Sequence, residues 1–116
     1  MNAVLLDTGP IVALLDSSER RHRECAELVA KLEAPLVTCE AVIAEACYLL
    51  SDLKGASTAV LENVESGNFL IPYRVIGRTA RLVKLMKKYA DLPMDFADAC
   101  LVDLASQLGI GRIFTL

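Results

Sequence analysis

Apolar residues follow two patterns along the chain, and these predict its secondary structure. Short unbroken apolar runs are typical of strands buried on both faces, whereas apolar residues that recur every three or four positions are typical of helices with one buried side. The runs predict strands at residues 3–6, 35–38, 69–75 and 112–116, and the periodic stretches predict helices at 11–15, 19–32, 42–53, 57–65, 78–89 and 97–108. Helices between short buried strands predict an α/β fold, a three-layer α/β/α sandwich with a central parallel sheet whose last strand lies at the end of the sequence.

Turn-forming residues set the expected ends of several helices. Ser17 and Ser18 offer an N-terminal cap to the helix 19–32, because serine oxygens accept hydrogen bonds from free backbone N–H groups. Gly55 is expected to close one helix and Gly109 another, since glycine readily adopts the left-handed conformation that ends many helices. The sequence shows no repeat or linker, so we expect one domain with a single core.

Composition and charge exclude several classes of protein. Hydrophobic residues make up 54% of the 116 residues and charged residues 23%, which is typical of a soluble globular domain. The sequence has neither a run of ~20 apolar residues nor a basic start leading into an apolar segment, so we expect a cytoplasmic protein without a membrane partner. The net charge of −3 excludes binding of nucleic acid through a strongly basic overall surface. A single histidine and four cysteines without paired spacing indicate neither a zinc site nor a disulfide framework.

Asp7 directly follows the first expected strand and precedes a helix. The carboxyl ends of the strands in an α/β sheet usually carry the ligand site, so Asp7 is the first candidate for chemistry. The alternative is that its side chain only caps the helix that Pro10 helps to begin.

Glu45 and Asp98 each place a charge on or beside the apolar side of their own helix. Glu45 lies three residues after Val42 and four before Leu49, and Asp98 lies one turn ahead of an apolar stripe. Burying an ionised carboxylate without a partner costs several kcal/mol, so such residues are normally paired with a cation or a metal. The alternatives are an edge position at which Glu45 reaches solvent and, for Asp98 and its neighbour Asp95, interaction with the dipole of the helix N-terminus.

The expected meeting of three acids suggests a metal ion. Carboxylates from separate elements that meet at one edge of a sheet repel one another unless a cation lies between them. Oxygen ligands favour a hard ion, Mg²⁺ or Mn²⁺, with waters and substrate phosphate completing its shell. Such an ion polarises a phosphodiester and lowers the pKa of a bound water that attacks it. The candidate chemistry is therefore metal-dependent phosphodiester hydrolysis without a covalent protein intermediate.

Four short motifs, in this order and spacing, resemble the PIN-domain family, and most closely its VapC-like toxins. They are Val4-Leu5-Leu6-Asp7-Thr8 with Ala13-Leu14-Leu15, Val42-Ile43-Ala44-Glu45, Asp95-Phe96-Ala97-Asp98-Ala99, and Ile113-Phe114-Thr115. The resemblance covers essentially the whole chain, although each motif alone is weak. It implies hydrolysis of RNA with Mg²⁺ or Mn²⁺ as the cofactor. Asp7, Glu45 and Asp98 would be the metal-binding acids, and Asp95 a further acid of the same catalytic pocket.

The resemblance also implies partners, and the chain departs from the family at one point. In the family a further acid usually follows the Thr of the last motif by two positions, and here the sequence ends at Leu116, one residue short of it. We therefore expect a single PIN-like domain, 1–116, without the family's extreme C-terminal segment. Thr8 and Thr115 are secondary candidates that would hydrogen-bond a metal-bound water or a phosphate, or only the backbone around them. The family implies the toxin of a type II toxin-antitoxin pair, which binds an antitoxin protein and forms a homodimer.

One expected helix offers basic residues to an RNA substrate. The helix 78–89 carries four cations at intervals of three and four residues, namely Arg78, Arg81, Lys84 and Lys88. We expect them either to bind RNA phosphate or to form an ordinary solvated face. His22 lies in a charged stretch, so we expect it to be exposed and without a catalytic role.

Other functions use the same kind of site or the same fold. Phosphotransfer domains of the receiver or haloacid-dehalogenase type also place acids at strand ends. A dehalogenase needs a second acid two residues after the first, where this chain has Gly9, and the Lys that a receiver needs after a late strand is absent. A catalytically silent PIN-like module that binds protein partners, or a stand-alone RNA-processing nuclease without an antitoxin, would keep the same fold.

Overall fold

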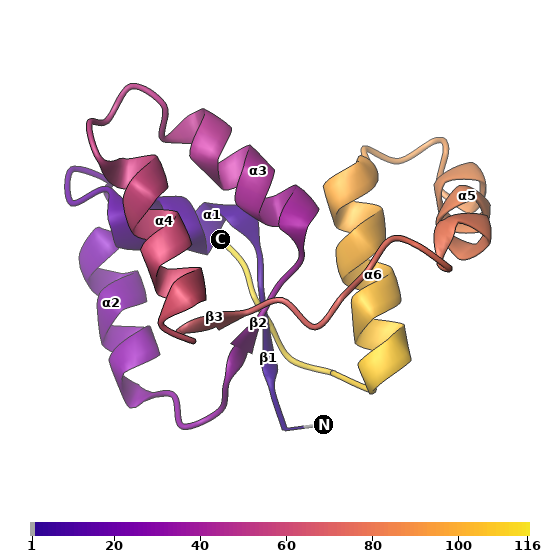
Figure 1. Ribbon diagram of the computed structural model, residues 1–116, viewed down its shortest axis with the longest axis horizontal. Coiled ribbons are helices and arrows are strands. Elements are labelled where there is room, and N and C mark those ends of the chain that lie inside the picture. Colours follow the sequence, from indigo (N-terminus) through magenta and orange to yellow (C-terminus); the bar gives the residue numbers. More distant parts are fainter. Residues whose placement is uncertain (1) are drawn as a thin grey trace.

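A parallel sheet lies at the centre of the computed structural model, which describes residues 2–116 (Figure 1). Its strands are β1 (Val4–Leu6), β2 (Leu36–Val37), β3 (Phe69–Leu70) and β4 (Ile113–Phe114). They lie in the order β3-β2-β1-β4, and each neighbouring pair is parallel. The carboxyl ends of the strands therefore meet at one edge of the sheet, beside the start of the helix that follows β1.

Helices cover both faces of the sheet. They are α1 (Thr8–Leu15), α2 (His22–Lys31), α3 (Glu40–Leu49), α4 (Ala56–Glu65), α5 (Thr79–Lys88) and α6 (Phe96–Leu108). Figure 1 shows α1 to α4 on one side of β1 and α5 and α6 on the other. The predicted three-layer α/β/α architecture with a parallel sheet is confirmed, and its last strand comes last in the sequence.

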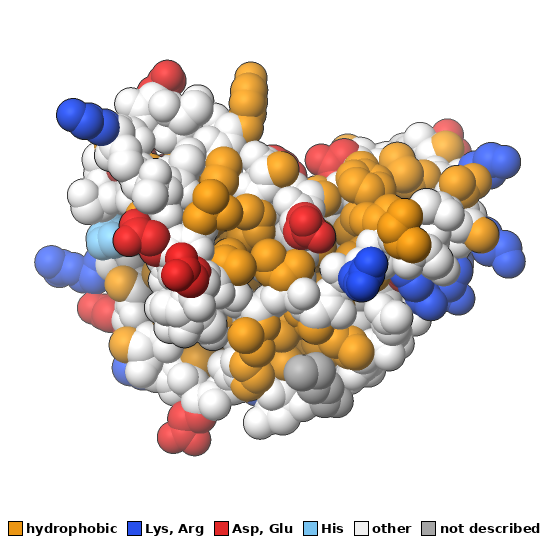
Figure 2. Space-filling view, in the orientation of Figure 1, with side chains coloured by type: hydrophobic (Ala, Val, Ile, Leu, Met, Phe, Trp, Pro, Cys, Tyr) orange, Lys and Arg blue, Asp and Glu red, His pale blue; other side chains and the backbone are white. Residues whose placement is uncertain are grey.

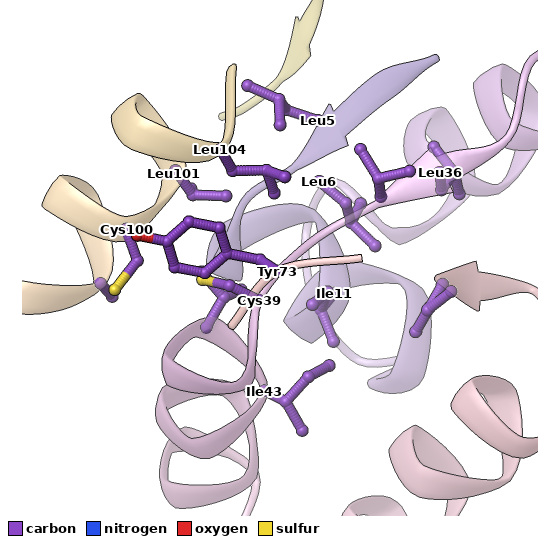
Figure 3. Packing of buried hydrophobic residues seen from close by; sticks show 14 of the residues in the cluster. Leu5, Leu6, Ile11, Leu36, Cys39, Ile43, Tyr73, Cys100, Leu101 and Leu104 are labelled. Carbon is purple, nitrogen blue, oxygen red and sulfur yellow. The ribbon is translucent and has the colours of Figure 1, made fainter. Parts of the chain in front are cut away.

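The core lies where the sheet meets helices on both faces. All three residues of β1 are buried, as expected for a continuous apolar run in a covered parallel sheet. Figure 3 shows Leu6 and Leu36 from the strands packing among helix side chains that include Ile11 and Leu104. Leu6, Ile11 and Leu104 are completely buried, so this layer fixes α1 and α6 on the sheet.

The first two helices begin elsewhere than predicted. α1 begins at Thr8, three residues earlier than expected, because the Asp7 side chain caps it. α2 begins at His22 with Arg21 as its N-cap residue, so the predicted start at residue 19 is wrong. The serines do not cap it, since the Ser18 hydroxyl and backbone N–H instead donate to Asp16 Oδ1, at 2.6 and 3.0 Å.

Two predicted boundaries in the middle of the chain are also wrong. α3 ends at Leu49, and Leu53, which was expected on its buried side, is 42% exposed outside the helix. Gly55 does not close α3 but serves as the N-cap residue of α4 in the left-handed region, at φ 82°. β3 has two residues, and Tyr73 lies beyond it with a buried side chain.

The four cysteines are free thiols, and three of them are buried. They behave as small hydrophobic residues of the core. Within residues 2–116, none of the helices has the length and apolar character that crossing a membrane requires.

Candidate active site

Asp7 is held in place at the carboxyl end of β1. Its Oδ1 accepts a hydrogen bond from the backbone N–H of Thr8 at 2.8 Å. Its Oδ2 accepts one from the Thr115 hydroxyl at 3.0 Å, across 108 residues of sequence. Asp7 therefore caps α1, as the simpler alternative proposed, and it also lies at the sheet edge where a ligand site was expected.

Asp95 and Asp98 form the start of α6. Asp95 Oδ1 accepts from the backbone N–H of Asp98 at 2.9 Å, and Asp98 Oδ2 accepts from the backbone N–H of Asp95 at 3.1 Å. This reciprocal capping box satisfies two free donors of the helix N-terminus. The capping box uses one oxygen of each carboxylate, so the other oxygen of each can still receive a ligand.

Glu45 lies in α3, and the negative charges of the other acids act on its carboxyl group. Burial is the main factor that raises the pKa of the Glu45 carboxyl, followed by the negative charge of Asp95. The hydroxyl of Thr8 lowers this pKa, whereas Asp7 and Asp98 add smaller effects that raise it. The predicted position of Glu45 beside an apolar helix side agrees with its half-buried state.

Asp98 lies in α6, across from α3, and negative charges of the same acids act on its carboxyl group. Burial raises the pKa of the Asp98 carboxyl most, and the hydrogen bond from the Asp95 backbone opposes this shift. The charges of Asp95 and Asp7 raise the Asp98 pKa further. The acids predicted from three separate motifs therefore share one electrostatic environment, at the point where β1, α3 and α6 meet.

The donor atoms of this site fit a hard divalent cation held by few protein ligands. Every acidic candidate offers carboxylate oxygen, which Mg²⁺ and Mn²⁺ prefer. Thr8 Oγ1 is buried and makes no hydrogen bond of good geometry to any described residue, although it lies near enough to Glu45 to lower the pKa of that carboxyl. An unpaired buried hydroxyl is unfavourable, so it suits a water or phosphate oxygen beside the ion.

The acids do not form a finished metal cage. Within residues 2–116, no three acidic, histidine or cysteine side chains converge closely enough to hold an ion by themselves. Mg²⁺ usually keeps several waters and binds through one or two carboxylates together with substrate phosphate. The arrangement fits that open mode of binding and not an all-protein cage.

Two largely apolar hollows flank the acids. One, of about 330 Å³, is lined by Asp7 and Asp98 together with Leu5, Leu101, Val102, Ala105 and Ile113 among others. The second, of about 580 Å³, lies between α3 and α6 and is lined by Glu45 and Asp95 together with Ala41, Ala44, Tyr48, Leu49, Phe96 and Ala97. Figure 2 shows acidic and hydrophobic side chains together in the region between these two helices. Apolar walls limit hydration and so strengthen the electrostatic interactions inside the site.

The basic residues predicted to contact RNA fall into two groups. Arg78 and Arg81 both form ion pairs with Asp103, at 2.8 and 3.2 Å. Lys84 and Lys88 are exposed on α5 and form no ion pair with another described residue. The expectation of an ordinary solvated face is wrong for Arg78, because its side chain is only 26% exposed.

Sequence reasoning missed Asp103 and its partner Tyr73. Asp103 is completely buried, and its Oδ2 accepts a hydrogen bond from the Tyr73 hydroxyl at 2.7 Å. The sequence did indicate that Asp103 is buried, because it follows Ala99 by four residues and Cys100 by three. These positions share a buried helix face. His22 also differs from expectation, because it is half-buried and its Nδ1 lies 2.7 Å from the carbonyl oxygen of Ala13.

The raised pKa values of Glu45 and Asp98 predict how the metal-free protein responds to pH. The folded state holds these protons more tightly than the unfolded state, so these two carboxyls do not destabilise the fold below their ordinary pKa values, and they destabilise it increasingly as pH rises through the raised pKa. We expect Glu45→Gln to raise the melting temperature of the metal-free protein at pH 7 and to reduce the gain that the parent shows between pH 7 and pH 5. Glu62→Gln, at an exposed position of α4, is the control. A lower melting temperature for Glu45→Gln, with an unchanged pH profile, would contradict the shared acidic environment.

Comparison with known proteins gives the family of this chain. The PIN-domain family model matches residues 4–116. Ribonuclease VapC26 of Mycobacterium tuberculosis (strain ATCC 25618 / H37Rv) is 28% identical over 115 residues, which cover 97% of this chain and 85% of that protein. The crystal structure of Mycobacterium tuberculosis VapC20, a sarcin-ricin loop cleaving toxin, has a similar fold with a TM-score of 0.89 at 19% identity, covering 98% of this chain and 89% of that one. Because the family model matches nearly the whole sequence, this chain belongs to the PIN-domain family.

Proposed function

We propose that this protein is a metal-dependent endoribonuclease, the toxin of a type II toxin-antitoxin pair. The observation that carries the proposal is that burial, together with the charges of Asp95 and Asp7, raises the pKa values of Glu45 and Asp98, so that acids from three elements of the fold act on one another at one place. Clusters of like charge with perturbed pKa values are typical of functional sites. The acids also lie in the same order as the motifs that resemble the family.

Each residue of the acidic site has its own proposed role in hydrolysis. Asp7, Glu45 and Asp98 would hold Mg²⁺ or Mn²⁺, which when bound supplies a Lewis acid and lowers the pKa of a water. The Thr115 hydroxyl orients Asp7 through Oδ2, and the capping box orients Asp98. This geometry is set before substrate arrives, and such preorganisation is a large part of catalysis. The buried Thr8 hydroxyl, which lowers the pKa of Glu45, would donate to a phosphate oxygen.

RNA is the proposed substrate because of both the site and the relatives. One relative carries the name ribonuclease, and the structural neighbour is described as a toxin that cleaves the sarcin-ricin loop. The net charge of −3 leaves RNA binding to local cations. Arg81, Lys84 and Lys88 on α5 supply such cations on one helix. Arg78 contributes less to the proposed RNA binding, because two of its nitrogens bond Asp103.

An antitoxin peptide is the proposed protein partner. Tyr48, Leu49 and Phe96 are 78%, 56% and 46% exposed on the hollow between α3 and α6. An amphipathic helix suits such an apolar groove, and an arginine on it would reach the carboxylates of Glu45 and Asp95 at the same hollow. We also propose a homodimer from the family resemblance, which light scattering of the purified protein would test.

Metal titration tests the proposed activity. We expect no cleavage of labelled RNA oligonucleotides in excess chelator, and cleavage on addition of Mg²⁺ or Mn²⁺. The same ions should raise the melting temperature, because a ligand at 100 times its Kd stabilises the fold by about 2.7 kcal/mol. Na⁺ at matched ionic strength is the control, since screening alone would also reduce repulsion between the acids. Cleavage that persists in chelator, or no cleavage with either ion on structured and single-stranded RNA, would refute the proposal.

A further inference from the structure

A buried ion cluster joins α5 to α6 away from the acidic site. Asp103 is completely buried, and its two oxygens accept from Tyr73 Oη at 2.7 Å, from Arg78 Nε and Nη2 at 2.8 Å each, and from Arg81 Nε at 3.2 Å. Such a fully bonded carboxylate holds its partners in a single arrangement. None of these residues is one of the acids that the proposed hydrolysis uses.

The two arginines are held in different ways. Arg78 uses two nitrogens, one for each oxygen of Asp103, and its side chain is 26% exposed. Arg81 uses Nε alone, and its side chain is 55% exposed. Nε is therefore the only Arg81 nitrogen bonded to another described residue, which leaves both terminal nitrogens for a ligand.

The exposed part of Arg81 belongs to a basic hollow. Arg81, Lys84, Leu85 and Lys88 line a space of about 170 Å³ on α5. Figure 2 shows lysine and arginine side chains gathered over α5, at the right of the view. The Lys88 ammonium also lies 5.2 Å above the ring centre of Tyr89, which restrains it. The hollow thus presents several cations, of which Arg81 and Lys88 are held in place by neighbours.

We propose that Asp103 is a positioning residue, which holds Arg81 by Nε so that its terminal nitrogens bind a backbone phosphate of the RNA beside Lys84. The inference rests on the proposed function and deepens it by naming how the substrate is held. A guanidinium fixed before binding loses less conformational entropy when it pairs with phosphate. Arg78 then serves as the internal counter-ion of Asp103 and not as a contact to RNA.

α6 connects this phosphate site with the acids. Asp103 follows Asp98 by five residues, about 7.5 Å along the helix axis, and about 140° around it. α6 therefore presents Asp98 toward the acidic site and Asp103 toward α5. An RNA strand that reaches the acids on one side of α6 would therefore also be held at Arg81 on the side that faces α5.

Binding of RNA without metal tests the role of Arg81 separately from cleavage. The probe is a fluorescently labelled 12-nucleotide RNA, titrated by anisotropy in excess chelator at several salt concentrations. We expect Arg81→Ala to weaken binding about tenfold and to reduce the slope of log K against log salt by about 0.7, the value for one phosphate contact on a single strand. Lys87→Ala, which removes the same charge at an exposed position of α5 outside the hollow, should weaken binding much less.

Arg81→Lys separates positioning from charge. A lysine ammonium can bond Asp103 or the phosphate but lacks the separate terminal nitrogens of arginine. We therefore expect Arg81→Lys to bind RNA nearly as weakly as Arg81→Ala. Binding equal to that of the parent would show that charge alone matters, and would overturn the role of Asp103.

A double-mutant cycle completes the test. Asp103→Asn should weaken RNA binding in the parent and have little further effect in the Arg81→Ala background, because it acts through Arg81. Additive losses would overturn the inference. If Asp103→Asn does not fold, which circular dichroism shows, the Arg81→Lys result decides alone.

The outcomes also distinguish this inference from the proposed function. A parent that cleaves RNA with Mg²⁺ while Arg81→Lys binds like the parent refutes the positioning role only. A parent that binds RNA through Arg81 but never cleaves it refutes the nuclease only. A parent that neither binds nor cleaves RNA refutes both.

Discussion

Asp7→Asn is expected to lower RNA cleavage in the presence of Mg²⁺ by at least about a hundredfold, while the protein stays folded. Asparagine keeps the size of the side chain, and its oxygen can still accept from the Thr8 N–H that Asp7 now caps. Asparagine and aspartate are about equally good N-cap residues, so α1 should keep its start. What is lost is the negative charge at the carboxyl end of β1, where the cation would bind. Initial cleavage rates across a Mg²⁺ titration, with circular dichroism of each variant, measure this effect.

A matched control uses the other end of α1. Asp16 is the C-cap residue of that helix and bonds Ser18 rather than any residue of the acidic site. Asp16→Asn should therefore cleave RNA at the rate of the parent. The melting temperature of metal-free Asp7→Asn should be no lower than that of the parent, because one repelling charge is gone. Full activity of Asp7→Asn would show that Asp7 does not take part in cleavage, and would refute the proposed metal site.

Asp103→Asn is expected to lower the free energy of unfolding by about 3–5 kcal/mol, the usual effect of removing one partner from a buried ion pair. It would leave Arg78 without the carboxylate that two of its nitrogens contact. The loss is large beside a total stability of about 5–15 kcal/mol for a domain. Urea denaturation at pH 7 measures it. Asp52→Asn, at an exposed position between α3 and α4, is the control and should change stability by less than about 0.5 kcal/mol.

The pH dependence of the Asp103 effect has a definite sign. Hydrogen bonds from Arg78 lower the pKa of Asp103 most, burial opposes them, and the pKa falls from 3.8 to about 2. The stability that this shift provides, on the order of 2 kcal/mol, is therefore complete above pH 3.8 and is lost as pH falls toward about 2. The parent should lose this stability between pH 4 and pH 2, and Asp103→Asn should show a flatter profile there. Equal acid sensitivity of the two proteins would contradict the ionised state of Asp103.

Two aspartates of one helix thus have opposite environments. Asp98 faces other acids, and its pKa is raised, whereas Asp103 faces two arginines and a tyrosine, and its pKa is lowered. A carboxylate with its own cations is already neutralised and stabilises the packing of α5 on α6. Asp98 pairs with no cation among residues 2–116, which is the physical reason to expect an external cation at Asp98 and not at Asp103.

The sequence by itself determined the order of strands and helices along the chain and marked the candidate acids. Apolar runs and helical spacing are local properties, so the bounds of α4, α5 and α6 agree with prediction within one residue. Glycine also marked the end of α6 correctly, with Gly109 in the left-handed region at φ 65°. The acids Asp7, Glu45 and Asp98 stood out because each placed a charge at a strand end or beside an apolar helix side.

Only the tertiary structure decided which side chains meet. The hydrogen bond between Asp7 and Thr115 joins residues 108 positions apart, and no local sequence pattern predicts such a contact. The same holds for Tyr73, Arg78 and Arg81 around Asp103. The sequence offered both arginines as candidate RNA contacts, and only the folded structure shows that they are also partners of a buried acid. Local propensity sets where a helix starts and which side is apolar. Whether a charged group on it finds a cation, another acid or solvent depends on what the folded chain packs against that side.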